Sequence, residues 1–281
     1  MWSNYHSHNL YCDGKSTLPE YLDEARATGV ASLGFSSHAP LPFPCKWCMR
    51  EDKLRSYIRE IDKLKRAANG IEIYKGLEID FVPGVVSARD FVAMLDYTIG
   101  SIHFVDAYEG TRWEIDNTLG VFKTGLDKIF QNNIRAAVTR YYELTRQMIT
   151  AAPPHIVGHL DKIKMHNQQE ALFEESESWY KNEVDKTLQA IKHANVIVEV
   201  NTRGLYKKKT VNTYPSPWIL ERVCEAHIPI TLSSDAHHRS ELICEFEPTA
   251  THLRDIGFKK LSILNHGIWK QVPFTENGLE L

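Results

Sequence analysis

Histidine and acidic side chains recur along this chain in places where they could bind metal ions. His6 and His8 flank Ser7 in an extended segment, and alternation along such a segment points both imidazoles to the same side. Two imidazoles on one side can share a metal ion, although histidine pairs also occur on strands that bind none. The pair alone therefore leaves both interpretations open.

The other candidate ligands follow or end short apolar segments that read as strands. They are His38, Glu78, His103, His159, Asp235 and His237. Any single histidine of this kind is more often a hydrogen-bonded core or surface residue than a ligand. Together with His6 and His8 they make six histidines at matching strand ends. Such a set favours a shared metal site, since the active site of a parallel barrel forms at the carboxyl ends of its strands.

The ligand types also indicate which metals fit. Imidazole nitrogens with a few carboxylates suit zinc, iron or manganese, and the two oxygens of a carboxylate such as Glu78 can bridge two ions. Asp13 in the first loop is a candidate for a further oxygen ligand. A turn aspartate is an equally good interpretation of Asp13 from its local sequence.

Short β-branched segments alternate with longer amphipathic ones along the chain, which predicts βα units around a parallel sheet. The predicted strands are Trp2–His6, Ala31–Ser36, Ile71–Glu78, Tyr97–Ile102, His155–His159, Val196–Asn201, Pro229–Ser233 and Lys260–Leu264. The predicted helices are Leu18–Thr28, Asp52–Ala68, Ser87–Leu95, Leu126–Thr150, Ser176–His193, Ser216–Glu225 and Thr249–Ile256. Residues 104–125 are predicted to form a long loop. Its Trp113 either covers a ligand at the barrel mouth or packs on the outside.

Composition narrows the class of protein. The 281 residues, 43% of them hydrophobic and 25% charged, fit one large α/β domain or two smaller ones. Since we find no repeat or linker, we expect one domain over residues 1–281. No apolar run is long enough to cross a membrane and no leader pattern opens the chain, so we expect a cytoplasmic protein.

The charge pattern argues against a long nucleic acid as the partner. The formal net charge of -3 comes from interspersed signs, so no broad basic surface is expected. Bound cations in an acid-lined pocket would instead attract a small anionic ligand.

Five cysteines are sparse and odd in number, which favours reduced thiols over a disulfide framework. Cys45 and Cys48 have the spacing of a redox motif or zinc knuckle. Because a second pair at matching spacing is missing, we interpret them as packing residues.

Taken in order, these motifs resemble those of the PHP (polymerase and histidinol phosphatase) superfamily, from His6 to His237. The matching segments are His-x-His at 6–8, the acid at 13, Ser-His-Ala-Pro at 37–40, Gly-Leu-Glu-Ile-Asp at 76–80, Gly-Ser-Ile-His at 100–103, Gly-His-Leu-Asp at 158–161 and Ser-Asp-Ala-His at 234–237. The resemblance implies a distorted TIM-like barrel of seven βα units with three divalent metal ions at the carboxyl ends of the strands. Eight predicted strands are one more than that.

The resemblance also implies which residues share each ion. One ion would be held by His6, His8, Glu78 and Asp235, a second by Asp13, His38 and His237, and a third by Glu78, His103 and His159. Glu78 would bridge two ions. Asp13 takes a position that is histidine in some relatives, which leaves the identity and occupancy of the second ion open.

Within the superfamily, the length and the segment Glu199–Gly204 look most like the monofunctional histidinol-phosphate phosphatases of histidine biosynthesis. The expected reaction converts L-histidinol phosphate to L-histidinol and phosphate. Other substrates stay open: a nucleotide, a short nucleic acid cleaved by a phosphodiesterase or exonuclease, or phosphotyrosine. A non-catalytic metal-binding module is the alternative from another class.

The expected mechanism is in-line attack on phosphorus by a hydroxide that bridges two metal ions. Asp235 is predicted to act at the reacting centre as a ligand, and Arg203, just beyond a strand, to bind the phosphate with its guanidinium. His238 is a candidate acid for the departing alkoxide, although it could simply face solvent.

Several neighbours of these residues are candidates for supporting roles. Ser101, Trp113 and Lys164 are candidates for contacting the substrate. Asp80 and Asp161 are candidates for orienting the ligand imidazoles.

Overall fold

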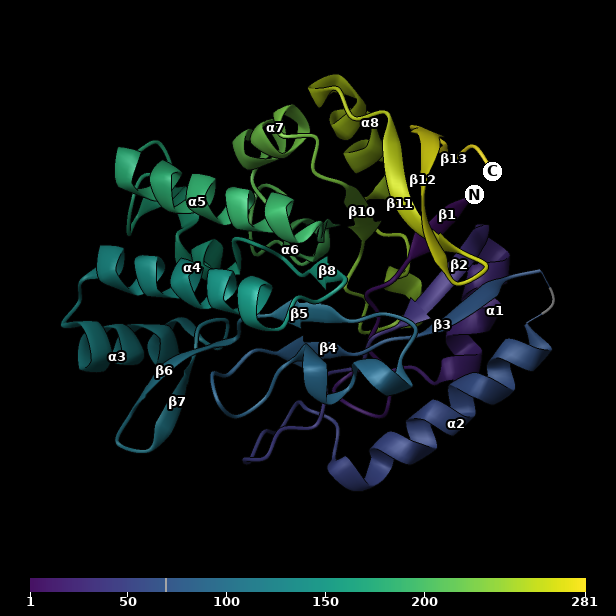
Figure 1. The fold of residues 1–281 in the computed structure, drawn as a ribbon, viewed down its shortest axis with the longest axis horizontal. Coiled ribbons are helices and arrows are strands. Elements are labelled where there is room, and N and C mark those ends of the chain that lie inside the picture. The colour runs from purple at the N-terminus through teal and green to yellow at the C-terminus, as the bar shows by residue number, and fades with distance from the viewer. Residues whose placement is uncertain (69) are drawn as a thin grey trace.

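Two parallel β-sheets with helices packed around them form the framework of the computed structural model, which describes residues 1–68 and 70–281 (Figure 1). One sheet has the strand order β1-β2-β3 and the other β10-β9-β8-β5-β4. The strands are β1 (Trp2–Asn4), β2 (Val30–Phe35), β3 (Glu72–Lys75), β4 (Glu78–Asp80), β5 (Ile99–Ser101), β8 (Ile156–Val157), β9 (Ile197–Asn201) and β10 (Ile230–Ser233). All neighbouring pairs are parallel. The predicted parallel α/β fold is therefore confirmed.

Two isolated bridges join the two sheets. His38, after β2, forms a parallel bridge with Glu78 of β4, and Ser7, after β1, forms one with Ala236, after β10. At the second seam the Ala236 carbonyl accepts a hydrogen bond from the His8 N–H (2.7 Å), and the Ala236 N–H donates to the His6 carbonyl (3.1 Å). These seams bring the strand ends of both sheets to one rim.

The connecting helices pack against the sheets with their apolar faces. They are α1 (Leu18–Thr28), α2 (Glu51–Ala67), α3 (Leu119–Phe130), α4 (Ile134–Ala151), α5 (Ser178–Ala194), α6 (Arg203–Tyr206), α7 (Pro217–Glu225) and α8 (Phe246–Ile256). Buried hydrophobic residues from Trp2 to Leu279 form one core cluster. Among the described residues, we find no helix with the length and apolarity to cross a membrane.

The predicted eighth strand lies outside the parallel sheets. The segment predicted as Lys260–Leu264 is β11 (Lys260–Asn265), which pairs antiparallel with β12 (Ile268–Thr275). β12 then pairs antiparallel with β13 (Gly278–Leu279). A two-residue turn, His266 and Gly267, both with positive φ, allows the tight reversal. This hairpin accounts for the extra strand.

Two predicted helices differ from the structure. Residues 126–150 do not form one helix, because Gln131 and Asn132 adopt positive φ values of 52° and 61° and end α3. Asn133 then caps α4 by accepting a hydrogen bond from the Ala136 N–H (3.1 Å). Residues 87–95 form two short 3₁₀ turns rather than one helix.

The predicted loop over residues 104–125 is also wrong. The segment forms an antiparallel hairpin of β6 (Phe104–Tyr108) and β7 (Thr111–Glu114), followed by the start of α3. Gly110, with a φ of 78°, lies in the turn between the two strands, where a positive φ favours glycine.

Trp113 on this hairpin is a core residue. Its side chain is fully buried, and its ring lies 5.2 Å from that of Phe122 and 5.7 Å from that of Phe130, between ring centroids. Both phenylalanines belong to α3. Trp113 therefore anchors the hairpin to α3 instead of covering a ligand, which corrects the lid interpretation.

The Trp113 packing makes a sharp prediction about stability. A Cβ atom added at Gly125 would lie 2.0 Å from Cδ1 of Trp113, so Gly125→Ala should lower the free energy of unfolding by about 1–3 kcal/mol through overpacking. Gly120→Ala in the same helix is the matched control, since its Cβ would meet nothing closer than 3.8 Å. The control should be neutral or slightly stabilising. Equal denaturation midpoints in urea for the two variants would contradict this account.

The cysteines depart from expectation at one pair. Cys45 and Cys48 form a disulfide with Cα atoms 5.5 Å apart, within the usual bridging distance. The prediction of reduced thiols is wrong for this pair, because the loop after β2 folds the two residues back on each other. Cys12, Cys224 and Cys244 are free thiols, as predicted.

Candidate metal centre

All nine residues predicted as metal ligands gather at the joined rim of the two sheets. Eight of them follow a parallel strand, and Glu78 is the first residue of β4, shortly after β3 ends at Lys75. They are His6, His8, Asp13, His38, Glu78, His103, His159, Asp235 and His237. Because the strands are parallel, residues far apart in sequence reach the same place.

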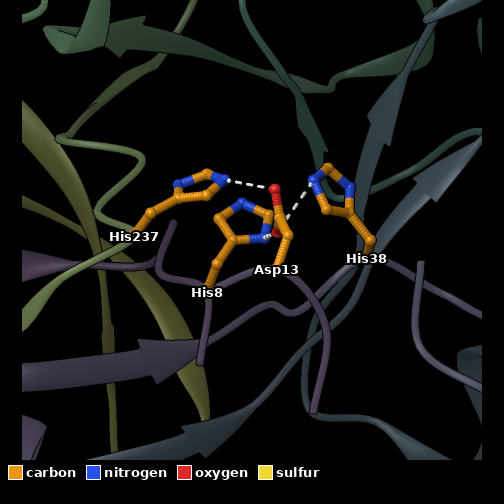
Figure 2. Close-up of side chains that lie close together, drawn as sticks. All are labelled: His8, Asp13, His38 and His237. Atoms are coloured by element: carbon orange, nitrogen blue, oxygen red, sulfur yellow. Dashed lines mark ion pairs between the residues drawn. The ribbon is translucent and has the colours of Figure 1, made fainter. Parts of the chain in front are cut away.

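Asp13 lies among three imidazoles, as Figure 2 shows. Its carboxylate is 3.2 Å from Nε2 of His237, 3.8 Å from Nε2 of His38 and 3.9 Å from Nδ1 of His8. One donor atom from each of the four residues lies within 4.8 Å of the others. This group contains the expected set of Asp13, His38 and His237, with His8 in addition.

Asp235 forms a second group with the first two histidines. Its Oδ1 lies 3.3 Å from Nε2 of His8 and 3.7 Å from Nε2 of His6. The imidazoles of His6 and His8 point to the same side, as expected, with ring centroids 5.1 Å apart. The Ser7 hydroxyl points away and donates to the Gly34 carbonyl (2.9 Å).

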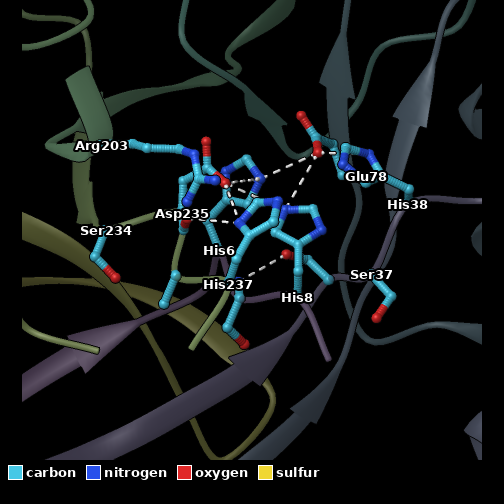
Figure 3. Close-up of polar contacts among 12 residues, drawn as sticks. His6, His8, Ser37, His38, Glu78, Arg203, Ser234, Asp235 and His237 are labelled. Carbon is cyan, nitrogen blue, oxygen red and sulfur yellow. Dashed lines mark hydrogen bonds and ion pairs between the residues drawn. The ribbon is translucent and has the colours of Figure 1, made fainter. Parts of the chain in front are cut away.

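Glu78 contacts histidines that follow several different strands, and Figure 3 shows its carboxylate facing the imidazoles of His6, His8 and His38. Its Oε2 is 3.0 Å from Nδ1 of His38 and 3.2 Å from Nε2 of His6. Its Oε1 is 2.8 Å from Nε2 of His159 and 3.6 Å from Nε2 of His103. The two oxygens therefore face different histidines, an arrangement in which one carboxylate can serve two ions.

Two buried carboxylates behind the site orient its imidazoles. Nδ1 of His6 lies 2.6 Å from Oε1 of Glu199, and Nδ1 of His103 lies 3.0 Å from Oδ1 of Asp80. These contacts turn Nε2 of each ring toward Glu78 and favour the tautomer with the proton on Nδ1. Asp80 was predicted for this role. Glu199 was missed, although a single acid inside the apolar strand Ile197–Asn201 is a signal for it.

Burial and neighbouring charges raise the pKa values of some groups in the site and lower those of others. Burial alone would lower the pKa of His6, but the carboxylates of Glu199, Asp235 and Glu78 raise it well above its usual value. Burial would likewise lower the pKa of His103, but the carboxylates of Asp80 and Asp116 raise it to about 10.

His8 and Glu78 are shifted the other way. Burial lowers the pKa of His8 well below its usual value, and neighbouring imidazolium charges add to this. Burial would raise the pKa of Glu78, but the surrounding histidines lower it. Strongly shifted titrations concentrated at one rim are typical of a functional site.

A cavity of about 360 Å³ opens beside the cluster. Arg203 lines it and is held in place by a hydrogen bond from Nη1 to the Asp235 carbonyl (2.7 Å) and another to the Tyr206 hydroxyl (3.2 Å). Three lysines that the sequence did not single out also line the cavity, namely Lys162, Lys207 and Lys209. The cavity is therefore lined by basic side chains in addition to the acidic and histidine side chains of the candidate ligands.

Three residues predicted to act on the substrate make contacts with other protein groups. Ser101 is buried and donates a hydrogen bond to Oε1 of Glu78 (2.7 Å). Lys164 is buried in an ion pair with Asp161 (2.7 Å), away from the cavity wall. His238 caps the short 3₁₀ turn Arg239–Glu241, where its side chain accepts from the Ser240 N–H.

Asp161 also differs from its predicted role. Its carboxylate accepts hydrogen bonds from the backbone N–H (2.9 Å) and hydroxyl (3.1 Å) of Ser216. It therefore holds the start of α7 and orients none of the candidate ligand imidazoles.

Comparison with known proteins agrees with this geometry. A probable histidinol-phosphatase of Deinococcus radiodurans is 27% identical over 90% of this chain and 92% of its own length. The histidinol-phosphatase of Bacillus subtilis is 29% identical over 86% of this chain and 96% of its own length.

Solved structures show the same fold. The putative histidinol phosphatase of Listeria monocytogenes superposes with a TM-score of 0.77 at 20% identity, over 88% of this chain and 99% of its own. Histidinol phosphate phosphatase of Lactococcus lactis, solved with zinc, L-histidinol and phosphate, superposes with a TM-score of 0.69 at 19% identity, over 100% and 99%. The PHP domain family model matches residues 4–203. The chain therefore belongs to the PHP domain family.

Proposed function

We propose that this protein is a metal-dependent phosphatase that hydrolyses L-histidinol phosphate to L-histidinol and phosphate. The names of the relatives from Deinococcus radiodurans and Bacillus subtilis support this substrate. The Lactococcus lactis structure contains zinc, L-histidinol and phosphate, which supports metal-dependent hydrolysis of this ester.

The observation that carries the proposal is a set of buried ring nitrogens that face carboxylates. Nε2 of His6, Nε2 of His8 and Nδ1 of His38 are buried and have no hydrogen-bond partner among residues 1–68 and 70–281. Burying a polar atom without a partner is costly. Metal ions bound between these nitrogens and the carboxylates of Glu78 and Asp235 would satisfy them.

Three divalent ions fit the donors, in our proposal. His6, His8, Glu78 and Asp235 would hold one ion, Asp13, His38 and His237 a second, and Glu78, His103 and His159 a third. Nitrogen and oxygen donors in these numbers suit zinc, iron or manganese. Such ions, when bound, lower the pKa of a water molecule and neutralise the oxygens of a phosphoryl group.

The chain's own residues would bind the ester and balance its charge. The guanidinium of Arg203 sits beside Asp235, where it can donate paired hydrogen bonds to phosphate oxygens. Lys162 and Lys207 add positive charge to the same wall. Because carboxylates raise the pKa values of His6 and His103, these imidazoles must release protons before their ring nitrogens can act as ligands.

We further propose that the two sheets act as one closed barrel of seven βα units within a single domain over residues 1–281. The bridges His38–Glu78 and Ser7–Ala236 support closure at both seams. Counting β3 and β4 as one interrupted strand gives the seven strands. The cytoplasmic location expected from the sequence stays a prediction.

Metal analysis combined with a substrate screen tests the proposal. The purified protein should carry zinc, iron or manganese and release phosphate from L-histidinol phosphate faster than from nucleotides or phosphotyrosine. Bound metal with turnover of a nucleotide alone would keep the family and discard the substrate. Bound metal with no turnover of any ester would favour a non-catalytic module.

Glu199→Gln should weaken metal binding without removing a ligand. Glu199 lies 2.6 Å from Nδ1 of His6 and accepts the His159 N–H (2.8 Å), so its loss should reduce metal affinity about 10- to 100-fold. Competition with a chelator measures this. Glu183→Gln, which removes another buried carboxylate from a salt bridge with Arg146, is the control and should retain wild-type metal affinity. Equal affinities in the two variants would exclude the orienting role.

A further inference from the structure

The cavity beside the metal centre is lined by more than the candidate ligands and the basic residues. Arg203, fixed on the Asp235 carbonyl, lines it together with Asp116 and Trp47. Oδ2 of Asp116 is 3.9 Å from Nε2 of His103, and the rings of Trp47 and His103 have centroids 5.3 Å apart. Asp116 and Trp47 therefore both lie beside His103 at the cavity wall.

The backbone beside Asp116 is fixed, and the Asp116 carboxylate is free to accept hydrogen bonds. The preceding residue, Ile115, donates its N–H to the His103 carbonyl (3.0 Å), which fixes the backbone beside the cavity. Within the described residues the carboxylate makes no hydrogen bond, and its nearest cation is Nζ of Lys162 at 3.8 Å. The side chain is 25% exposed. Its oxygens can therefore accept hydrogen bonds from a ligand in the cavity.

Glu114, the other acid on this wall outside the candidate ligands, is already occupied. Its Oε2 accepts a hydrogen bond from Nδ2 of Asn117 (2.7 Å). Asp116 is thus the carboxylate with free acceptor capacity on this wall.

Trp47 provides an aromatic surface next to Asp116. Its ring stacks on Phe104, with centroids 5.6 Å apart and planes 12° apart, and meets His38 edge-on at 4.4 Å between centroids. These contacts fix the indole at the cavity wall. An aromatic face beside a carboxylate suits a ring or a cationic group.

From this arrangement we infer that Asp116 binds the positively charged nitrogen group of the substrate, while Trp47 packs against its organic part. The inference deepens the proposed function and rests on it, because L-histidinol phosphate joins a phosphate to an amine and an imidazole. The phosphate lies at the metal centre beside Arg203 and the cationic half extends past His103. Esters with an anionic organic part meet a carboxylate there that repels them, and esters with a neutral part leave its hydrogen-bonding capacity unused, which disfavours both.

Asp116→Asn tests the inference on the metal-loaded enzyme. The ratio of kcat/KM for L-histidinol phosphate to kcat/KM for p-nitrophenyl phosphate should fall about 10- to 100-fold, since the negative charge that strengthens the interaction with a cationic group is lost. Inhibition by L-histidinol should weaken by a similar factor, and inhibition by inorganic phosphate should weaken far less. Asp116→Glu should restore part of the ratio.

Glu109→Gln is the matched control. It removes the same charge from the same hairpin at an exposed position in the turn, and it should keep the wild-type ratio. A metal measurement on each variant separates recognition from an effect through His103.

Two outcomes would overturn the inference. One is an equal loss for both esters accompanied by loss of metal, which would make Asp116 a support of His103. The other is unchanged affinity for L-histidinol in Asp116→Asn, measured by calorimetry. Failure of the wild-type enzyme to hydrolyse L-histidinol phosphate would contradict the proposed function instead, and the calorimetric comparison would still test Asp116.

Discussion

Replacing Glu78 with glutamine is expected to lower kcat for phosphate-ester hydrolysis by at least about 10³-fold, because several kcal/mol of transition-state stabilisation depend on the metal centre. The carboxylate lies within 3.6 Å of His6, His38, His103 and His159. An amide keeps the size of the side chain but loses the negative charge and one acceptor. The metal content of the variant should fall as well, by more than one ion per chain if Glu78 bridges two.

Kinetics at saturating substrate and elemental analysis of the same sample measure both effects. Glu247→Gln on the exposed face of α8 serves as the control for loss of one acidic charge. A Glu78→Gln protein with full metal content and more than a tenth of the wild-type kcat would contradict the central role of this residue.

Arg203→Ala should lower kcat/KM by about 10²- to 10³-fold, in the range found when a preorganised donor to a developing charge is removed. The guanidinium lies over Asp235 and is anchored through Nη1 to the Asp235 carbonyl. Among the described residues its Nη2 and Nε make no hydrogen bond, which leaves them for phosphate oxygens. Since Arg203 is no candidate ligand, the metal content should be retained.

Arg203→Lys distinguishes charge from geometry. Lysine keeps the positive charge but cannot form two parallel hydrogen bonds, so it should recover only part of the lost activity. If Arg203→Ala instead lost metal, or kept its affinity for inorganic phosphate, then the arginine would serve the structure of the Asp235 loop and not the phosphate.

The candidate ligands could be predicted from the sequence because each depends on its own strand. A histidine or acid that ends an apolar segment must lie at the carboxyl edge of a parallel sheet, whichever strands become its neighbours. His38, His103 and His159 satisfy this rule, whereas Glu78 reaches the same place as the first residue of β4, after the chain breaks beyond β3. The parallel α/β fold follows from the same alternation of short and long segments.

Residues whose roles depend on partners from other strands were harder to predict. Glu199 acts through His6, 193 positions away, and Asp116 gains its place because Ile115 pairs with the backbone of His103. Neither relation leaves a periodic signal. Trp113 resembled a loop aromatic because the five-residue strand β6 and four-residue strand β7 are too short to show clear alternation.

The division of α3 from α4 was missed for a local reason. Gln131 and Asn132 take left-handed backbone conformations without a glycine, so the usual punctuation of a helix end is missing from the sequence. The apolar periodicity continues across the break and predicts one long helix.

The separate pairing of β6 with β7 has a consequence for how substrate range can change. These two strands form their own two-stranded sheet, and Asp116 follows β7, whereas the candidate ligands sit on or after strands of the parallel sheets. A substitution or a grafted hairpin here can alter which organic group of the substrate is bound, while the candidate metal ligands on the parallel sheets stay unchanged. Related enzymes could thus diverge in specificity by exchanging one small surface module.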